Sequence, residues 1–550
     1  MFFKKENRYF ALIVFYLILT SIIYLKLKDF GIHIEEKFHR MNGLYWLNYI
    51  SEVFHLDKIQ IKTNLKMNEI GDHTLSPVNY YDKWGVIFDV PLALIETIFN
   101  INDAKDVYYL KHFFSFLIFL LGSFFFYKIL YKRFDNFLFS FFGTLLFVTT
   151  PRIFGDSFLY KDVLFLSFFT ISLYFLFEVL NKKNIKNIFL FSLLSAATIN
   201  LRIFGIFLPA TLIFILLIIY FKNKNLNEFL KNCLLHIIFL VVLTILLWPY
   251  LWSNPIANFL NLFSSLEKDL VNIKIFFNGN YLDNYFLPDT YLPTWIFISS
   301  PVIPIIFFII GITSYAIRLS KRYINIKENT FFDDIWRSKN EQKDFIIFFI
   351  FTSMFLTFIV LSAPFYNGWR LVYFFNIFIL YFCFYQINNF NNFYRKKNII
   401  KKLSTLIIIL AVTYNVISLI IYHPYQSIYF SNLIDTKTKN SFEGDYYGLS
   451  VKHFFLKVNS FDKNKNINTG VASHTPIQRG LESLDKNLRK KFTIVGQEYE
   501  NADYIYKNNI SEVNSFLNKK YEVPKNFSKV YELKIRNLTI YEIYKNNRLF

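Results

Sequence analysis

Long apolar runs separated by short polar segments dominate the chain from residue 9 to residue 422. About eleven of these runs approach or exceed the length that a helix needs to cross the ~30 Å hydrocarbon core of a bilayer. They extend over Tyr9–Leu27, Val107–Leu130, Phe137–Thr150, Val163–Leu180, Ile188–Leu201, Ile203–Phe221, Cys233–Trp252, Trp295–Leu319, Phe345–Ser362, Leu371–Ile387 and Leu403–Tyr422. The pattern predicts a mainly α, polytopic transmembrane helical bundle.

Two regions depart from this pattern. Residues 29–106 are amphipathic, too polar to cross a membrane and too long for a simple connection, and loops of this size usually carry function.

After residue 422 the charges spread throughout, and Leu449–Val458 has helical periodicity. Apolar and polar residues alternate on both sides of Arg536-Asn537, which predicts a β-hairpin. We therefore expect a transmembrane domain over residues 1–422, including the long loop 29–106, and a C-terminal soluble α/β domain over residues 423–550.

Basic residues alternate between the connections and predict the orientation in the membrane. Every second connection is rich in Lys and Arg, whereas the intervening turns carry one or two basic residues each. The basic connections contain Lys128, Lys132 and Arg133; Lys182, Lys183 and Lys186; Lys222, Lys224 and Lys231; Arg318 to Lys343; and Arg395 to Lys402. This bias predicts a cytoplasmic N-terminus, and an odd number of spans then puts loop 29–106 and the C-terminal domain outside.

Composition narrows the classes of function. With 54% hydrophobic and 21% aromatic residues, the chain has too little polar cover for a soluble globule. The net charge of +20 arises mainly in the short loops, so no nucleic-acid partner is expected. Cys233 and Cys383 both fall in or beside predicted spans and encode neither a disulfide framework nor a metal cluster.

The first candidate for chemistry is an acidic pair directly after the first span. Glu35 and Glu36 lie in sequence beside His33, His39 and Arg40. A carboxylate held next to a membrane can take a proton from an acceptor hydroxyl, and either Glu could serve as this general base. The structural alternative is that these charges only mark the membrane interface.

A second set of polar residues falls at the ends of spans on the same predicted face. Guanidinium and ammonium groups there would suit a lipid-linked phosphate or pyrophosphate, because they stabilise the charge of a departing phosphate. Snorkelling of Arg and Lys at helix ends is the alternative. Together with His39 and Arg40, the candidate substrate-binding residues are Arg152, Lys161, Asp162, Arg202, Arg370 and His423.

Several of these motifs resemble those of a known family. The segment Glu35-Glu-Lys-Phe-His-Arg-Met-Asn-Gly43 is similar to the acidic first-loop motif of the GT-C membrane glycosyltransferases, usually Asp-Glu. The likeness is to bacterial proteins of the protein O-mannosyltransferase and lipid A aminoarabinose transferase type, glycosyltransferase family 39. Four further segments resemble motifs of that group and its uncharacterised members, namely residues 150–162, 365–370, 423–432 and 442–450.

This resemblance implies a GT-C fold and an inverting transfer of a sugar from a polyprenyl-phosphate donor to a hydroxyl acceptor on the outer face. The first acidic residue, here Glu35, would be the general base, although Glu stands where the family usually has Asp. A misplacement of about one ångström can cost about a hundredfold in rate. The implied location is a bacterial inner membrane, the partners are the lipid-linked sugar and the bilayer, and a divalent cation is a possible cofactor.

Two other functions fit the same pattern. A transporter or flippase of a lipid-linked substrate also needs many spans, but transporters place ionisable groups near the bilayer midplane, where these spans are almost purely apolar. An accessory protein that keeps a GT-C fold without catalysis would account for the Glu in place of Asp.

Overall fold

The computed structural model describes residues 5–70, 84–159, 161–268, 273–324, 332, 334–394, 398–511 and 519–549. Eight helices in this part of the chain are long and apolar enough to cross a membrane. They are α1 (Lys5–Lys26), α5 (Ala104–Phe134), α8 (Asp162–Asn181), α10 (Phe207–Asn223), α11 (Leu226–Leu247), α14 (Val302–Ile324), α15 (Lys339–Val360) and α17 (Asn398–Tyr422). The protein is a mainly helical, multi-pass membrane protein.

The remaining predicted spans also form helices, but shorter or more polar ones. At 1.5 Å per residue, α6 (Phe137–Thr149) is about 20 Å long and α9 (Ile185–Leu201) about 25 Å, both below the thickness of the hydrocarbon core. Helix α16 (Phe375–Phe393) is buried at every position from Phe375 to Ile387 and forms the centre of the bundle. It contacts α14, α6, α17, α15 and α5, so its apolar residues face protein on all sides.

One predicted span is divided in two. The apolar run Trp295–Leu319 contains Pro301, and the structure ends α13 (Tyr291–Ser299) before it and begins α14 after it. Proline has no backbone N–H and disfavours helical geometry in the preceding residue. Ser300 accordingly has extended backbone angles, with φ −106° and ψ 152°.

Glycines allow close approach at two helix contacts in the bundle. A Cβ on Gly122 of α5 would lie 2.8 Å from the Cα of Ser167 in α8, and one on Gly311 of α14 would lie 2.2 Å from the Phe382 carbonyl oxygen of α16. The backbones of α5 and α8, and those of α14 and α16, are therefore nearly in contact. Helix α8 also contacts the 3-10 turn Arg370–Val372 that precedes α16. Both this helix and this turn contribute residues to the candidate site.

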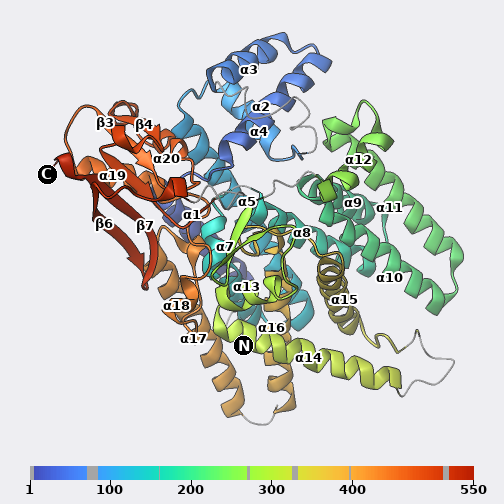
Figure 1. Ribbon diagram of the computed structural model, residues 1–550. Coiled ribbons are helices and arrows are strands. Elements are labelled where there is room, and N and C mark those ends of the chain that lie inside the picture. Colours follow the sequence, from blue (N-terminus) through green and yellow to red (C-terminus); the bar gives the residue numbers. More distant parts are fainter. Residues whose placement is uncertain are drawn as a thin grey trace.

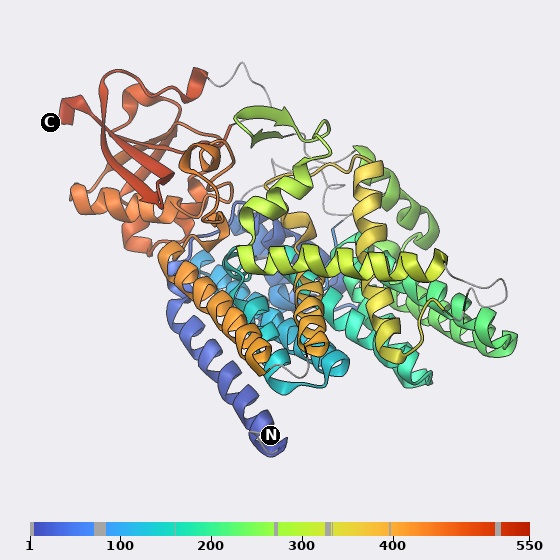
Figure 2. The ribbon, with the colours of Figure 1, turned by 90° about the horizontal axis from the view of Figure 1, so that it is seen from below.

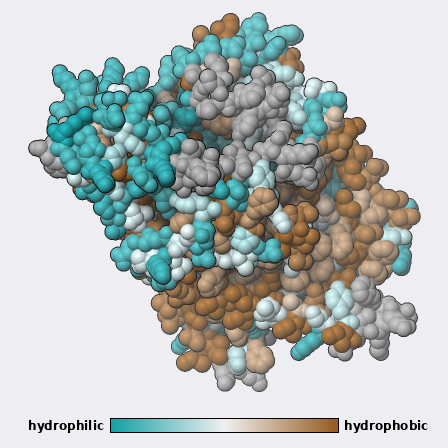
Figure 3. All heavy atoms as spheres, viewed as in Figure 1, coloured by the Kyte–Doolittle hydropathy of each residue, from teal (hydrophilic) through white to brown (hydrophobic). Residues whose placement is uncertain are grey.

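The two ends of the bundle differ in chemistry. Basic residues from separate connections meet acidic partners at one end, including Arg133 with Asp344 at 2.6 Å and Lys183 with Glu228 at 2.7 Å. The long first loop and the C-terminal sheet lie together at the other end, and Figure 2 shows the sheet far from the start of α1. Hydrophilic side chains gather over the sheet and hydrophobic ones over much of the bundle (Figure 3).

The first loop forms a small helical layer that lies beside the bundle (Figure 1). It consists of α2 (Glu36–Val53), α3 (Asp57–Ile70) and α4 (Asp89–Ile98), while residues 71–83 lie outside the described part. Arg40 of α2 binds Glu96 of α4 through Nη2 and Oε1 at 2.6 Å, and both side chains are buried. A Cβ on Gly43 would lie 2.5 Å from the Asp89 carbonyl oxygen, so α2 and α4 also pack closely.

The C-terminal region forms a five-stranded mixed sheet with α19 (Val451–Phe461) against it. The strands are β3 (Ile467–Val471), β4 (Phe492–Gly496), β5 (Tyr504–Lys507), β6 (Phe527–Ile535) and β7 (Leu538–Asn546), in the order β4-β3-β5-β7-β6. Strand β3 pairs in parallel with β4 and β5, and β7 pairs antiparallel with β5 and β6. The predicted hairpin is confirmed, since Arg536 and Asn537 have φ values of 50° and 64°. The soluble α/β character predicted for this region is confirmed as well.

Shorter elements connect these parts. They are α7 (Pro151–Asp156), α12 (Pro255–Lys268), the antiparallel pair β1 (Lys274–Phe277) and β2 (Asn280–Asp283), α18 (Thr436–Lys439), α20 (Gln478–Glu482) and α21 (Lys486–Arg489).

The segment that leads from α17 to α19 joins the C-terminal sheet to the first loop. The Ile34 amide donates to the carbonyl oxygen of Tyr447 at 3.1 Å. A Cβ on Gly31 would lie 2.2 Å from the Leu449 carbonyl oxygen, so these two segments of the chain are in contact there. Lys452 of α19 donates to the Tyr109 hydroxyl at 2.9 Å and also to the Lys28 carbonyl oxygen. The loop that carries Glu35 is therefore held from both sides, by the bundle and by the C-terminal region.

Candidate functional site

The acidic pair lies in a tight turn at the start of α2. The His33 amide donates to Oε1 of Glu36 at 2.9 Å, and the Glu36 amide donates to the His33 carbonyl oxygen at 3.1 Å. This reciprocal pairing resembles a capping box, in which a Glu side chain satisfies a backbone N–H at the helix start. The Glu35 amide donates to Nδ1 of His33 at 2.8 Å. The turn thereby fixes Glu35 and Glu36 in different directions.

Glu36 is committed to this structural role. Its side chain is 2% exposed, and Oε1 also accepts from Nε2 of His112 on α5 at 2.7 Å. Glu35 instead has 37% of its side-chain surface exposed. Of the two candidate bases, only Glu35 has a carboxylate that a substrate can reach.

Arg370 is the principal partner of Glu35. It begins a 3-10 turn (Arg370–Val372) before α16, and its Nη2 lies 2.5 Å from Oε1 of Glu35. The guanidinium is 2% exposed and is flanked by the rings of Tyr366 and Tyr447, at 4.6 and 5.4 Å from ring centroid to Cζ. Burial alone would raise the pKa of Glu35, but the charge of Arg370 holds this pKa well below its ordinary value.

Asp162 joins Arg370 to a second guanidinium. It begins α8, its Oδ2 lies 3.6 Å from Nη1 of Arg370, and its Oδ1 accepts a hydrogen bond from Nη2 of Arg202. Arg202 follows α9 directly, and its side chain is 12% exposed. Two arginines from different helix ends are thus bridged by one buried carboxylate beside Glu35.

Lys161 completes this charged cluster. Its backbone has φ +84°, which is strained for a residue other than glycine, and its Nζ lies 3.3 Å from the centroid of the Trp84 ring. Burial lowers the pKa of Lys161 to about 7, and the charge of Arg202 contributes to the same effect. Lys161 is therefore only partly protonated near neutral pH, and an approaching anion would favour its charged form.

His39 and Arg40 serve the packing of the first loop. Nδ1 of His39 lies 3.4 Å from Oδ2 of the buried Asp89, which also accepts from Asn42. Nε and Nη2 of Arg40 both donate to Oε1 of Glu96 on α4. The His39 amide donates to the Glu35 carbonyl oxygen at 3.1 Å, so His39 lies one helical turn from the base, whereas Arg40 points away from it.

Arg152 is not brought into this cluster. It lies on α7 with no exposed surface, packed against the rings of Trp295 and Phe430 at 5.1 and 5.4 Å, and it donates to the Tyr429 carbonyl oxygen at 3.1 Å. It shares a buried polar cluster with Asp156, Tyr373, Glu443, Tyr446 and Tyr447. Burial raises the pKa of Asp156 to about 7 and that of Glu443 to about 8.

His423 also lies apart from Glu35. Its Nε2 is 2.9 Å from Oδ2 of Asp29, and its ring contacts Phe30 edge-on at 5.4 Å. It therefore ties the end of α17 to the start of the first loop.

Sequence reasoning missed several residues that shape the site. Tyr447 donates to Oδ2 of Asp156 at 2.9 Å while its ring lies 4.1 Å from that of His33, so it connects the buried cluster to the acidic turn. Tyr366 and Tyr447 both fall in segments that carry the family resemblance, but those segments do not show which side chain faces Arg370. No sequence signal singled out Trp84 or His112.

A divalent cation is not supported by this arrangement. Within the described residues, no three His, Cys, Asp or Glu side chains are placed to hold a metal ion. The carboxylates of Glu35 and Asp162 both face arginine.

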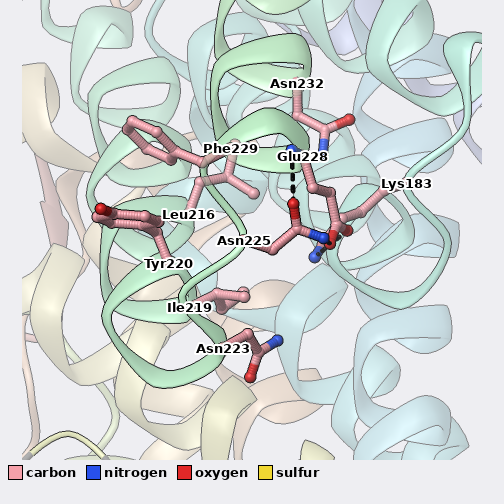
Figure 4. Close-up of a pocket in the computed structure, with 9 residues that line it drawn as sticks. All are labelled: Lys183, Leu216, Ile219, Tyr220, Asn223, Asn225, Glu228, Phe229 and Asn232. Atoms are coloured by element: carbon pink, nitrogen blue, oxygen red, sulfur yellow. Dashed lines mark hydrogen bonds and ion pairs between the residues drawn. The ribbon is translucent and has the colours of Figure 1, made fainter.

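Two surface cavities lie away from this cluster. One, at the basic end of the bundle between α10 and α11, is lined by Lys183, Tyr220 and Glu228 and offers only about 10 Å³ to a water-sized molecule (Figure 4). The other, of about 490 Å³, lies at the C-terminal sheet and is lined by Tyr281, Lys507 and Glu522 among others. The first is too small for a sugar.

Comparisons with known proteins find likeness in structure only. No protein-family profile and no curated protein matches the sequence. The oligosaccharyltransferase of Archaeoglobus fulgidus in the apo form aligns with a TM-score of 0.42 and 9% identity over 81% of this chain and 65% of that one. The same organism's AglB in complex with an inhibitory peptide and a dolichol-phosphate aligns with a TM-score of 0.41 and 11% identity over 92% and 70%. The chain thus spans about two thirds of these enzymes, and a likeness at this level describes the course of the chain alone.

Proposed function

We propose that this protein is an inverting membrane glycosyltransferase of the GT-C type, which moves a sugar from a polyprenyl-phosphate donor to a hydroxyl acceptor at the outer face. One observation carries the proposal: the accessible carboxylate of Glu35 lies against the buried guanidinium of Arg370, with Asp162, Arg202 and Lys161 in the same cluster. A proton acceptor and three cations at the end of a membrane bundle suit hydroxyl attack on a lipid-linked sugar phosphate. The motif resemblance supports the same chemistry.

The reaction follows from these groups. Glu35 takes the proton of the acceptor hydroxyl as its oxygen attacks the anomeric carbon. The bond from that carbon to the phosphate oxygen breaks, and the polyprenyl phosphate leaves with the electron pair. Arg370, Arg202 and Lys161 stabilise the charge that develops on the leaving phosphate, an effect worth about 2.7–4 kcal/mol for one lost donor in other enzymes.

Burial assigns the two glutamates different roles within this proposal. A positioned carboxylate contributes about a hundred- to ten-thousandfold to such a step. Glu35 can supply it, whereas Glu36 is enclosed between the His33 amide and His112 and holds the turn in place. Arg152 has no exposed surface and acts within the protein interior.

The test is sugar release from a polyprenyl-phosphate donor by the purified chain and its Glu35→Gln and Glu36→Gln variants. Gln keeps the shape of the side chain but cannot accept the proton. We expect Glu35→Gln to lose transfer by about a hundredfold or more while retaining lipid-phosphate binding, and Glu36→Gln to lose less. Transfer at the wild-type rate by Glu35→Gln would overturn the proposed base.

The same assay separates the alternatives. Lipid-phosphate binding without sugar release by the wild-type chain would favour the inactive accessory protein. Movement of the intact donor across the bilayer without release would favour a flippase.

A further inference from the structure

His33 faces two hydrogen-bond donors at once. Its Nδ1 lies 2.8 Å from the amide nitrogen of Glu35, and its Nε2 lies 3.2 Å from Nη1 of Arg370. An amide and a guanidinium can only donate, and a neutral imidazole has one nitrogen with a free lone pair. One of the two contacts therefore sets an N–H against another N–H.

The turn decides which nitrogen carries the proton. Burial lowers the pKa of His33 to about 3, so the ring is neutral at physiological pH. The contact with the Glu35 amide is the shorter one. Two hydrogen bonds between His33 and Glu36 hold the turn, one from the His33 amide to the Glu36 carboxylate and one from the Glu36 amide to the His33 carbonyl oxygen, and they fix the Glu35 amide in place. Nδ1 therefore accepts, and Nε2 carries the proton and presents it to Arg370.

Nε2–H of His33 and the guanidinium of Arg370 thus present hydrogen-bond donors side by side. The Nε of Arg370 is also buried without a hydrogen-bond partner. We infer that the Nε2–H of His33 and the guanidinium of Arg370 form a binding site for the phosphate group of a polyprenyl phosphate, a diester in the sugar donor and a monoester in the product, and that filling this site releases Glu35 from its ion pair. The inference deepens the proposed function by naming where the donor phosphate binds.

A phosphate resolves the opposition between the two donors. Its oxygens can accept from Nε2–H and from the guanidinium together, and arginine binds phosphate with two parallel hydrogen bonds. Phosphate and the Glu35 carboxylate are both anions, so they compete for the same guanidinium. Donor binding therefore replaces the 2.5 Å contact between Arg370 and Glu35.

This exchange would activate the base. As long as Arg370 neutralises it, the Glu35 carboxylate is a weak proton acceptor. A phosphate bound to Arg370 removes that attraction and adds a negative charge nearby, and both changes favour proton uptake by Glu35. Proton transfer is thereby restricted to the state in which the donor is bound.

Two substitutions of His33 test the binding site, because each keeps one function of the ring. Asn places an acceptor near the position of Nδ1 and no donor near Nε2, whereas Gln places a donor near Nε2 and no acceptor near Nδ1. The full chain in phosphatidylcholine nanodiscs is titrated with undecaprenyl phosphate. We expect His33→Asn to raise the Kd about tenfold or more, as for a lost hydrogen bond to a charged group, and His33→Gln to stay near wild type. Weaker binding by Gln than by Asn would show that His33 only shapes the turn and would overturn the inference.

A Glu35 variant tests the competition independently of His33. Glu35→Gln frees Arg370 and should bind undecaprenyl phosphate at least about tenfold more tightly than wild type. Glu52→Gln, which removes an exposed carboxyl near the end of α2, is the control, because a general loss of negative charge would tighten binding in both variants. Equal affinity of Glu35→Gln and wild type overturns the exchange.

The source of the phosphate is separated by competition. Phosphatidic acid in the nanodisc and inorganic phosphate in solution are added against undecaprenyl phosphate. Displacement by phosphatidic acid supports a phosphate site at the lipid surface. Binding of inorganic phosphate to a protein that binds neither lipid overturns the assignment to a lipid.

The binding measurements need no sugar transfer, so the two proposals can fail separately. If His33→Asn loses undecaprenyl phosphate while no variant releases sugar, the binding site stands and the proposed transferase does not. If transfer occurs and His33→Asn binds as wild type does, the transferase stands and the inference is wrong.

Discussion

Oε1 of Glu35 lies 2.5 Å from Nη2 of Arg370, although the two residues are 335 positions apart in the chain. This ion pair joins the accessible carboxylate to the 3-10 turn that precedes the central helix α16. Because the charge of Arg370 lowers the pKa of Glu35, removing Arg370 should change the pH at which Glu35 takes up a proton.

We predict that Arg370→Gln moves the acid limb of the activity profile to higher pH. Burial then acts on Glu35 unopposed and raises its pKa, so the carboxylate takes up its proton earlier as the pH falls. The pH dependence of folding stability in the wild-type protein follows from the lowered pKa of Glu35. A carboxyl with a lowered folded pKa contributes stability above its unfolded pKa, and that contribution is lost as pH falls through the folded pKa. The measurement is kcat/KM against pH for the residual activity of the variant.

Arg202→Gln is the control for this profile. Arg202 pairs with Asp162 rather than with Glu35, so its loss lowers the rate without moving the limb in the same way. An acid limb at the wild-type position in Arg370→Gln would contradict the prediction.

We predict that Asp162 and Arg202 are strongly coupled. Asp162 is 5% exposed and bridges two guanidinium groups, so Asp162→Asn leaves both facing each other. In a double-mutant cycle with Arg202→Gln, we expect a coupling free energy of about 1–3 kcal/mol in thermal or denaturant unfolding of the solubilised protein. Additive effects of the two substitutions would show that the bridge contributes nothing.

We predict that Glu443→Gln makes the protein more stable at alkaline pH. Burial raises the pKa of Glu443 to about 8, so the folded state holds a proton that the unfolded state releases at lower pH. Stability from this group is present at low pH and is lost as pH rises through the folded pKa, at about 1.4 kcal/mol per pKa unit. Gln stays neutral, so the Tm of the variant should fall less than that of wild type between about pH 6 and 9. The exposed Glu500→Gln serves as the control and should follow wild type.

We predict opposite membrane sides for the two ends of the bundle. The basic connections meet at the end away from the sheet, and the bias of Lys and Arg favours the cytoplasm for that end. Reporter fusions after Lys182 and after Asn468 should therefore give opposite signals. The same signal from both would remove the outer-face location on which the proposed function depends.

Hydropathy and turn chemistry predicted most of the fold. The eleven apolar runs all correspond to helices, and Arg536-Asn537 forms the expected hairpin because both adopt left-handed backbone angles. The division of one span at Pro301 follows from a local rule that the long apolar run obscured. That α16 is central, rather than facing lipid, depends on neighbours far away in the chain and has no local signature.

The candidate site was only partly readable. The position of the acidic pair after the first span indicated where chemistry could occur, and Arg370, Asp162, Arg202 and Lys161 do lie close together. The division of roles between Glu35 and Glu36 could not be read, because the burial of Glu36 depends on His112, which is 76 positions away. Arg152 looked equivalent to Arg202 in sequence, since both follow an apolar run, but Trp295 and Phe430 enclose it.

The contact between Ile34 and Tyr447 has a consequence for how the protein is made. Glu35 is synthesised early, whereas Arg370 and the segment around Tyr447 follow more than three hundred residues later. At about 5–20 residues per second, this interval is on the order of tens of seconds. During that time the Glu35 carboxylate of the nascent chain lacks both Arg370 and the segment around Tyr447 that packs beside the first loop. Under the proposed function, a chain whose synthesis stops within the bundle would lack the arrangement around Glu35 that transfer needs, and this arrangement would form only after the final quarter of the chain has been synthesised.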